Sequence, residues 1–304
     1  MRHDGGHVPG TLKSAAFSWN EGGQSEIPVL ISAPHGGRAY SSSLRDSMRY
    51  ADKAALKLED RYVDQLAAAV AKVTGALVLI AHAPRAMIDL NRSIDDLDST
   101  MLSDATPNVL RRIRQSHRAR SGLGLIPRRL GEIGEIWNRP LSFSEVTDRI
   151  EMIHRPYHGQ LETMLRKIRD RWGAALLLDL HSMPPLGVKH GAYAAPDFVI
   201  GDRFGSSCDP QLSARALSHL SSEGWLVAHN RPYSGGYVLD RHTAPRGGLH
   251  GLQLEICRAT YLDDELKELS PQAETVIASV ASLVRALVDE VIVLGGGHIR
   301  QAAE

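Results

Sequence analysis

Three polar side chains interrupt apolar runs in the sequence, and each stands where a buried strand is expected to end. His35 follows the run of residues 27–33 in SAPHGG, His181 closes LLLDLH, and Glu255 lies within HGLQLEI. Near-continuous apolar runs are typical of strands that are covered on both faces. Imidazole and carboxylate groups are the ligands of catalytic zinc sites, which also keep one position open for water. The pattern therefore predicts a metal site at one edge of a sheet.

Each of these side chains also has an ordinary explanation when it is taken alone. A single histidine at a strand end is more often a hydrogen-bonded loop residue, and a buried glutamate more often pairs with an arginine. Two histidines and a carboxylate at the same edge of one sheet favour the metal site over that coincidence. Asp179, which shares a strand face with His181, is placed to hold the second ring nitrogen of that ligand. Its alternative role is to cap a turn.

A further ligand is expected in the stretch LEDRYVDQL. Asp60 and Asp64 fall outside the apolar stripe of the helix that the spacing predicts here. We expect Asp64 to be an exposed surface carboxylate. The spacing does not separate Asp60 from its neighbour Glu59.

Polar residues also crowd the stretch HAPRAMIDLNRS, which follows the second expected strand. Arg85, Asp89, Asn91 and Arg92 lie within it. Arginine presents a planar fork of donors that fits a carboxylate. Arginine and asparagine beside a metal therefore suit a substrate with a free carboxylate. The alternative is a solvated loop in which Arg92 pairs with Asp89 or Asp95.

Residues 111–129, RRIRQSHRARSGLGLIPRR, form a strongly basic run, which makes a nucleic-acid-binding protein the non-enzyme alternative. The run holds no aromatic side chain for base stacking, and 35 basic residues balance 35 acidic ones over the chain. We therefore expect no nucleic-acid partner, and a solvated basic helix over residues 109–120.

Strands and helices alternate along the chain, which predicts a single three-layer α/β/α domain with a mostly parallel mixed sheet. Residues 95–140 have few strand signals and are expected to form an insertion of loops and short helices. The expected strands cover residues 27–33, 76–81, 174–180, 198–200, 225–228 and 252–256. The expected helices cover residues 52–73, 144–171 (kinked or broken at Pro156), 209–220 and 270–291.

Composition narrows the class of protein. With 304 residues, 43% of them hydrophobic, the chain can form one large globular domain. Cys208 and Cys257 form no CxxC pair, which argues against a disulfide scaffold and suits a reducing compartment. No run reaches the ~18 apolar residues of a membrane span, and the first residues are polar. We therefore expect a cytoplasmic protein with no signal peptide and no membrane partner.

The ordered set of motifs resembles the N-formylglutamate amidohydrolases. Its pieces are SAPHGG, EDRYVDQL, RAMIDLNR, GLGLIPR, HRPYHGQL, LLLDLHSMP, NRPYSGGYVLDRH and HGLQLEI, and they run from about residue 29 to residue 261. Any single piece is weak, whereas the set in this order is highly specific.

This resemblance implies a phosphorylase/hydrolase-like fold, as in zinc exopeptidases such as zinc carboxypeptidases and aspartoacylase. It implies a catalytic domain over residues 27–292, with an N-terminal extension over 1–26 and a flexible tail over 293–304. The family's reaction removes formate from N-formyl-L-glutamate in histidine degradation, so the partner is a small-molecule N-acyl amino acid. The alternatives are a zinc carboxypeptidase or another N-acyl amino acid deacylase.

The resemblance also implies roles for individual residues. The ligands of Zn²⁺, or of Co²⁺ or Mn²⁺ in its place, look like His35, Asp60 and His181. Glu255 looks like the general base, and Arg85 resembles the arginine that stabilises the oxyanion.

Substrate carboxylates require cationic groups. Asn91 and Arg92 match the pair that holds a substrate carboxylate in the relatives. Arg128, Arg241 and Arg246 compete for a second carboxylate. We also expect Gly36 and Gly37 to leave room beside His35 for substrate and water, and the loop of residues 233–237 to close over the substrate, its alternative being an ordinary turn.

Overall fold

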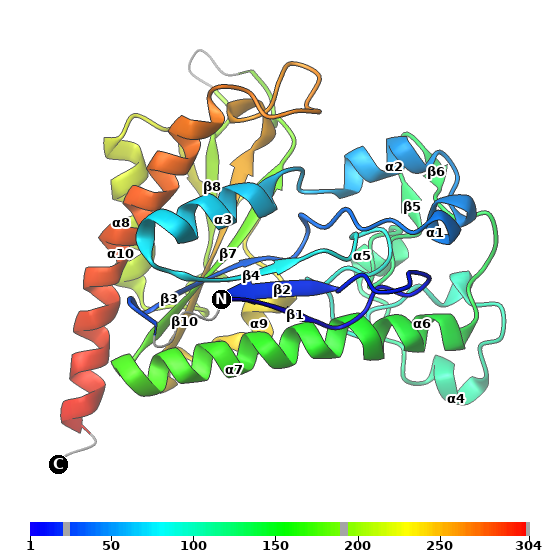
Figure 1. The fold of residues 1–304 in the computed structure, drawn as a ribbon, viewed down its shortest axis with the longest axis horizontal. Helices are drawn as coiled ribbons and strands as arrows, with labels where there is room; N and C mark the ends of the chain where they lie inside the picture. The colour runs from blue at the N-terminus through cyan, green and yellow to red at the C-terminus, as the bar shows by residue number, and fades with distance from the viewer. Residues whose placement is uncertain (21–24, 189–193, 302–304) are drawn as a thin grey trace.

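An eight-stranded mixed sheet forms the centre of the protein, in the order β1-β2-β4-β3-β7-β10-β8-β9 (Figure 1). A computed structural model describes residues 1–20, 25–188 and 194–301. The strands are β1 (Arg2–Gly5), β2 (Phe17–Asn20), β3 (Val29–Ala33), β4 (Leu77–Ala81), β7 (Ala175–Met183), β8 (Phe198–Gly201), β9 (Val227–His229) and β10 (Leu249–Cys257).

All six strands predicted from apolar runs are present, with ends shifted by a few residues. The additional strands β1 and β2 pair antiparallel with each other, and β2 pairs antiparallel with β4. The sequence of β1, RHDG, is polar and partly exposed, and that of β2, FSWN, alternates two apolar with two polar residues over only four positions, so neither has the apolar run that marks a buried strand. The segment that precedes residue 27 therefore contributes to the edge of the central sheet.

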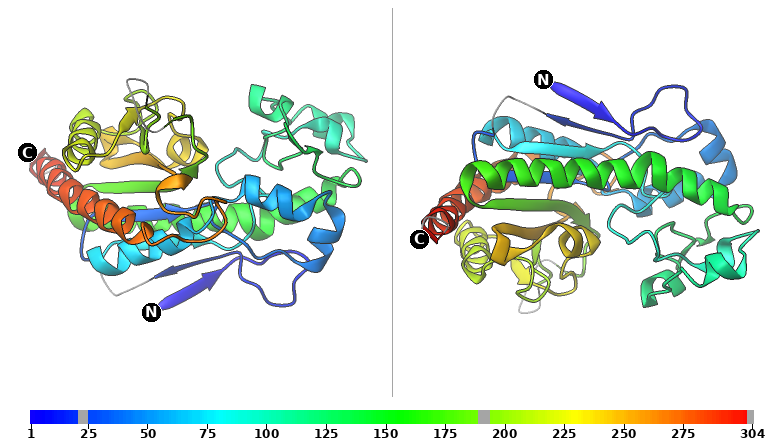
Figure 2. Two further views of the ribbon diagram at one scale, coloured as in Figure 1. Left: turned by 90° about the horizontal axis from the view of Figure 1, so that it is seen from above. Right: turned by 90° about the horizontal axis from the view of Figure 1, so that it is seen from below.

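Helices cover both faces of the sheet, and the predicted three-layer α/β fold is confirmed. The helices α3 (Val63–Thr74) and α10 (Ala273–Gln301) lie on one side, and α7 (Arg155–Trp172) lies on the other (Figure 2). Alternate side chains of β7 fill the two cores. Leu176, Leu178 and Leu180 pack with α3, α10 and α8 (Pro210–Ser222), whereas Leu177 packs with α7.

Two predicted helices differ from the structure in ways that bear on the site. The helix expected over residues 52–73 is divided into α2 (Ala51–Leu58) and α3. The helix expected over residues 144–171 is not broken at Pro156. Instead α6 (Phe143–Arg149) continues through a π-helical turn, Ile150–His154, directly into α7. The wider turn and the place of Pro156 in the first turn of α7 accommodate the missing N–H of proline. The last helix, α10, continues beyond residue 291 to Gln301.

The predicted insertion over residues 95–140 consists of short elements, and it lies at the opposite end of the molecule from the C-terminus (Figure 1). Two short helices replace the single helix expected over residues 109–120: α4 (Pro107–Leu110) ends just before the basic run, and α5 (His117–Arg120) lies within it. The elements are a 3₁₀ turn (Ser99–Met101), α4 (Pro107–Leu110), α5 (His117–Arg120), β5 (Arg129–Leu130) and β6 (Gly134–Glu135). The remaining helices of the described chain are α1 (Ser42–Ser47), α9 (Tyr237–His242) and two 3₁₀ turns, Pro245–Gly247 and Arg258–Thr260.

The three central strands β3, β7 and β10 are parallel, so their carboxyl ends share one edge of the sheet. In this register Ser32 lies opposite Asp179, Asp179 opposite Gln253, and His181 opposite Glu255. Paired residues of parallel strands point to the same face. One face of the central strands therefore carries a row of polar side chains. Within the described part of the chain, no helix is both long enough and apolar enough for a membrane span.

Candidate active site

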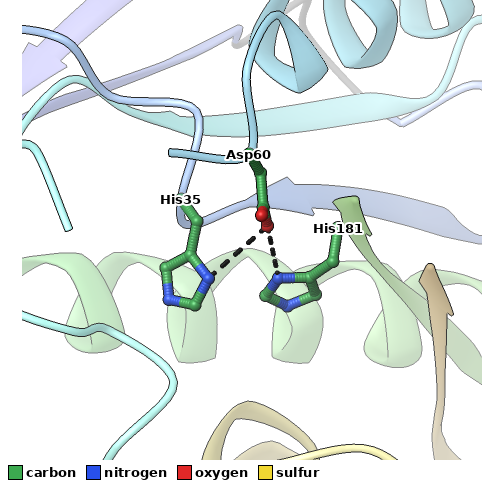
Figure 3. A group of neighbouring side chains, drawn as sticks. All are labelled: His35, Asp60 and His181. Carbon is green, nitrogen blue, oxygen red and sulfur yellow. Dashed lines mark hydrogen bonds and ion pairs between the residues drawn. The ribbon is translucent and has the colours of Figure 1, made fainter. Parts of the chain in front are cut away.

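Three buried side chains from distant parts of the chain meet at this edge of the sheet (Figure 3). His35 follows β3, His181 lies on β7, and Asp60 lies between α2 and α3. Asp60 Oδ2 is 3.5 Å from His35 Nδ1 and 2.9 Å from His181 Nδ1. One ligand atom from each residue lies within 4.8 Å of the other two. Ligands of a tetrahedral ion with bonds of ~2.1 Å lie about 3.4 Å apart, so this spacing suits one cation.

A carboxylate holds the far ring nitrogen of each histidine. His35 Nε2 is 2.7 Å from Asp89 Oδ1, and His181 Nε2 is 2.9 Å from Asp179 Oδ2. When each Nε2–H donates to its carboxylate, each Nδ1 presents its lone pair toward Asp60. His35 Nδ1 is buried and has no hydrogen-bond partner among the described residues. Carboxylate-supported histidines with converging lone pairs are the arrangement that a metal ion requires.

Asp60 reaches the histidines because the chain leaves the helical path between α2 and α3. The Asp60 N–H donates to the His35 carbonyl at 3.0 Å, and Tyr62 adopts a left-handed backbone with φ of 61°. The buried Arg258 guanidinium lies 3.4 Å from Asp60 Oδ1 and also donates to the Glu59 carbonyl. The second carboxylate oxygen of Asp60 is therefore held by a cation outside the cluster.

Glu59 is directed elsewhere. Its Oε2 accepts a hydrogen bond from Arg61 Nη1 at 3.1 Å. Of the two neighbouring carboxylates that the sequence left open, Asp60 is the one that joins His35 and His181. Asp64 is not the exposed surface carboxylate that was expected: it is half-buried and forms a two-pronged ion pair with Arg38 at 2.9–3.0 Å.

The charges of the cluster depend on one another. Burial opposes the charged form of Asp60, but the neighbouring His181 and His35 hold its pKa well below the usual range. Burial also opposes protonation of His181, but the charge and hydrogen bond of Asp179 raise its pKa well above the usual value. Without a metal the site therefore holds a proton on His181, and a metal ion would displace that proton.

Glu255 stands beside His181 on the adjacent strand β10, and its side chain is only 7% exposed. Gln253 Nε2 donates to Glu255 Oε1 at 2.8 Å. Burial raises the pKa of Glu255 to about 7. A carboxyl group with such a pKa can both accept and return a proton near neutral pH, as general acid–base catalysis requires.

Asp89 organises the loop that follows β4. Beyond its contact with His35, Asp89 accepts hydrogen bonds from Arg85 Nε at 2.9 Å and from the Asn91 N–H at 2.8 Å. The alternative ion pair expected between Arg92 and Asp89 is not formed. Arg92 instead donates to two backbone carbonyls, those of Leu123 and Asn91, each at 3.1 Å. Arg92 thus lines the same cavity as His35, Asp60 and His181, and it has no carboxylate partner among the described residues.

The Asn91 side chain is buried and already bonded within the protein. Its Oδ1 accepts from the Val238 N–H at 2.9 Å, and its Nδ2 donates to Gln253 Oε1 at 3.3 Å. The glycine-rich loop approaches it closely, because a Cβ atom at Gly236 would lie 2.5 Å from Asn91 Oδ1. Residues 233–237 thus pack on Asn91 and line the cavity described below; their closing over a substrate stays a prediction.

The glycines that follow His35 have a different role from the one expected. A Cβ atom at Gly36 would lie 2.9 Å from the Asp64 backbone N, and one at Gly37 would lie 2.2 Å from the Ala83 carbonyl O. These glycines allow close packing of backbone against backbone. They do not line the cavity, so the expectation that they leave room for substrate and water is wrong.

The structure does not bring the predicted holders of a second carboxylate to the site. Arg128 forms ion pairs with Asp98 and Glu135. Arg241 donates to the Tyr237 hydroxyl from an exposed position, and Arg246 is exposed. None of these three arginines lines the cavity. The spacing of arginines along the sequence did not reveal which of them are neutralised by neighbouring carboxylates.

A second group of buried histidines, not expected from the sequence, supports the loop that carries Asn91 and Arg92. His154 Nε2 is 2.9 Å from the Arg92 carbonyl, and His158 Nε2 is 3.0 Å from the Leu90 carbonyl. His158 Nδ1 lies 2.8 Å from His242 Nε2. Burial lowers the pKa of His154 to about 4 and of His242 to about 3, and it lowers that of His158 well below the usual value. These rings are therefore neutral donors at pH 7, and they fix the backbone on both sides of Asn91.

A cavity of about 920 Å³ is lined in part by His35, Asp60 and His181. This volume falls within the ~300–1,000 Å³ that is typical of small-molecule sites. Polar groups dominate its wall. The lining residues include His35, Asp60, Arg85, Asn91, Arg92, Arg114, Arg118, His181, Tyr233 and Glu255.

Comparisons with known proteins agree with this geometry. The family model described as N-formylglutamate amidohydrolase matches residues 27–262. An N-formylglutamate deformylase of Pseudomonas putida is 32% identical over 245 residues, which cover 79% of this chain and 84% of the relative. One from Pseudomonas aeruginosa is 29% identical over 287 residues, covering 92% and 97% of the two chains. The crystal structure of N-formylglutamate amidohydrolase from Ralstonia eutropha JMP134 superposes with a TM-score of 0.80 at 30% identity, covering 93% of this chain and 99% of the other.

Proposed function

The chain belongs to the N-formylglutamate amidohydrolase family and is an amide-bond hydrolase, and from this premise we propose that it hydrolyses N-formyl-L-glutamate to formate and L-glutamate with a bound divalent metal, Zn²⁺ in the first place. This reaction belongs to histidine degradation. Cys208 and Cys257 are both free and buried, which suits a reducing compartment, so we place the enzyme in the cytoplasm.

The observation that carries the proposal is the convergence of His35, Asp60 and His181 beside Glu255. Two neutral imidazoles and one carboxylate are a donor set that fits Zn²⁺, Co²⁺ or Mn²⁺. His35 Nδ1 is buried without a hydrogen-bond partner among the described residues, which supports a cation site at this point, because a buried polar atom is costly without a partner. We assign these three residues as the metal ligands.

Glu255 is the proposed general base. A divalent metal held here supplies Lewis-acid activation of water and of the substrate carbonyl. Glu255 accepts one proton from the attacking water as the new C–O bond forms at the formyl carbon. It then returns that proton to the amine nitrogen as the C–N bond breaks, which releases formate and the amino acid.

Arg85 is the proposed oxyanion holder, and Arg92 the proposed holder of a substrate carboxylate. Arg85 lines the cavity, and Asp89 both orients its guanidinium and raises its pKa against the effect of burial. One hydrogen-bond donor at an oxyanion is typically worth ~3 kcal/mol of transition-state stabilisation. Arg92 faces the same cavity with backbone carbonyls as its partners, so its charge is free for a ligand carboxylate. Asn91, whose amide is already bonded, holds the loop behind Arg92 in position.

Hydrolysis of a substrate panel tests the proposal. The purified protein, loaded with Zn²⁺, is assayed with N-formyl-L-glutamate, N-acetyl-L-glutamate, N-formyl-L-aspartate and a dipeptide with a free carboxyl end, each with and without chelator. We expect N-formyl-L-glutamate to give the highest kcat/KM and chelator to abolish turnover. Preference for the acetyl compound would favour another N-acyl amino acid deacylase, and preference for the dipeptide would favour a carboxypeptidase. Unchanged turnover after removal of the metal would contradict the metal site.

A further inference from the structure

The cationic side chains that line the cavity differ in whether a carboxylate neutralises them. Four of them have such a partner: Lys57 pairs with Glu132, Arg85 with Asp89, Arg203 with Asp240 and Arg258 with Asp60. Among the described residues, the remaining three guanidinium groups form no ion pair. These are Arg92, Arg114 and Arg118.

Arg118 is structurally tied to Arg92. The Leu123 N–H donates to the Arg118 carbonyl at 2.8 Å, and the Leu123 carbonyl accepts from Arg92 Nε at 3.1 Å. The short helix α5, which carries Arg118, is anchored in turn. Ser116 donates to Asp96 through both its N–H and its hydroxyl, at 3.0 and 2.9 Å. Leu123 thus links the backbone of Arg118 to the guanidinium group of Arg92.

The charge of Arg118 also affects the pKa values of other residues that line the cavity. Burial lowers the pKa of Arg92, the charges of Arg85 and Arg118 lower it further, and the charges of Asp89 and Asp96 oppose this effect. Burial raises the pKa of Tyr233, which also lines the cavity, and the charge of Arg118 opposes that rise. The guanidinium groups of Arg92 and Arg118 therefore repel each other, and neither of them forms an ion pair with a carboxylate among the described residues. A ligand with two carboxylates would convert this repulsion into two ion pairs.

We infer that Arg118 binds the side-chain carboxylate of the substrate while Arg92 binds its α-carboxylate, so that Arg118 determines selectivity for acidic N-acyl amino acids. The inference rests on the proposed function and replaces the arginines that the sequence suggested for the second carboxylate. Arg114 lacks the backbone link to Arg92 that holds Arg118 in place.

The test compares two substrates that differ in whether their side chain carries a charge. The Zn²⁺-loaded wild type, Arg118→Ala and Arg112→Ala are compared on N-formyl-L-glutamate and on N-formyl-L-glutamine, which has the same shape without the side-chain charge. Arg112 is the matched control, because it is exposed on the same basic segment and does not line the cavity.

We expect Arg118→Ala to lower kcat/KM for N-formyl-L-glutamate by roughly 10- to 100-fold and to leave the glutamine analogue within about two-fold of wild type. Arg118→Lys should recover part of the loss. An equal loss on both substrates, or no loss on either, would overturn the inference while the proposed function stands. A wild type that hydrolyses neither compound would instead contradict the proposed function itself.

Discussion

A conservative substitution of Glu255 tests its proposed role as general base. Glu255→Gln keeps the shape of the side chain but removes its ability to accept a proton. Because Glu255 is not among the three clustered ligands, the variant should retain stoichiometric Zn²⁺. We expect kcat to fall by ~10³-fold, since one group serves as both base and proton donor. Metal analysis and steady-state rates measure the two effects, and near-normal turnover would remove Glu255 from the mechanism.

The pH dependence of kcat/KM provides the control for the assignment of Glu255 as the general base. Glu255 acts as its carboxylate, so kcat/KM should fall as the pH drops through its pKa. Burial raises the pKa of Glu255 to about 7, and the positive charge of a bound metal lowers it. The acidic limb of the profile should therefore lie below pH 7 in the wild type and be absent from Glu255→Gln.

At this same scale, the sequence identified some of the residues that the structure brings together and missed others. His35, His181 and Glu255 interrupt apolar runs, so strand periodicity alone marks them. Asp89 lies in an irregular loop where no period applies, and its bond to His35 depends on the tertiary fold. Arg128 was a plausible substrate-binding residue by its type, but its neutralisation by distant acidic groups cannot be read from spacing.

At the scale of elements, buried histidines on the α6–α7 helix position the loop that carries Arg92. His158→Asn removes the donor that reaches the Leu90 carbonyl, whereas His158→Gln places an amide N–H near the same point. We expect the asparagine variant to raise KM for N-formyl-L-glutamate about ten-fold with its metal content unchanged, and the glutamine variant to recover most of the loss. Equal losses in the two variants, or a loss of metal, would show that His158 acts only in packing.

The division between α2 and α3 shows why one helix boundary escaped prediction. The apolar stripe that includes Leu58, Tyr62 and Leu66 keeps helical spacing straight across the break. The chain nevertheless leaves the helix there, because the Asp60 N–H bonds to His35 and the Glu59 carbonyl bonds to Arg258. Both partners are distant in sequence, so local periodicity does not reveal the break in the helix that places Asp60 beside the histidines.

At the scale of the whole molecule, a metal ion would connect three separate parts of the fold. A ligand that binds the folded state alone raises the free energy of unfolding, by ~4 kcal/mol when it is present at a thousand times its Kd. We expect excess Zn²⁺ to raise the Tm by about 5–10 °C over the chelator-treated protein. Scanning calorimetry of wild type and of His181→Ala checks this, and an equal shift in both proteins would place the bound metal elsewhere.

The global architecture was the most predictable level, since alternating strands and helices dictate a layered α/β fold. The edge strand β1 and its neighbour β2 were the exception. Both are stabilised by pairing along the sheet, β1 is polar, and the apolar alternation of β2 is only four residues long.

The π-helical turn that joins α6 to α7 has a consequence for how this gene can vary. Its five residues, Ile150–His154, include one more than a regular turn needs. The wider turn absorbs that extra residue, so the side chains of α7 keep nearly the angular position that four residues of ordinary winding would give them. Loss of one of the five residues should accordingly restore regular winding and leave His158 facing the Leu90 carbonyl. Loss of one residue in α7 ahead of His158 would instead turn that ring by about 100° about the helix axis. Chain length should therefore vary more readily in this stretch than in the helix that follows it.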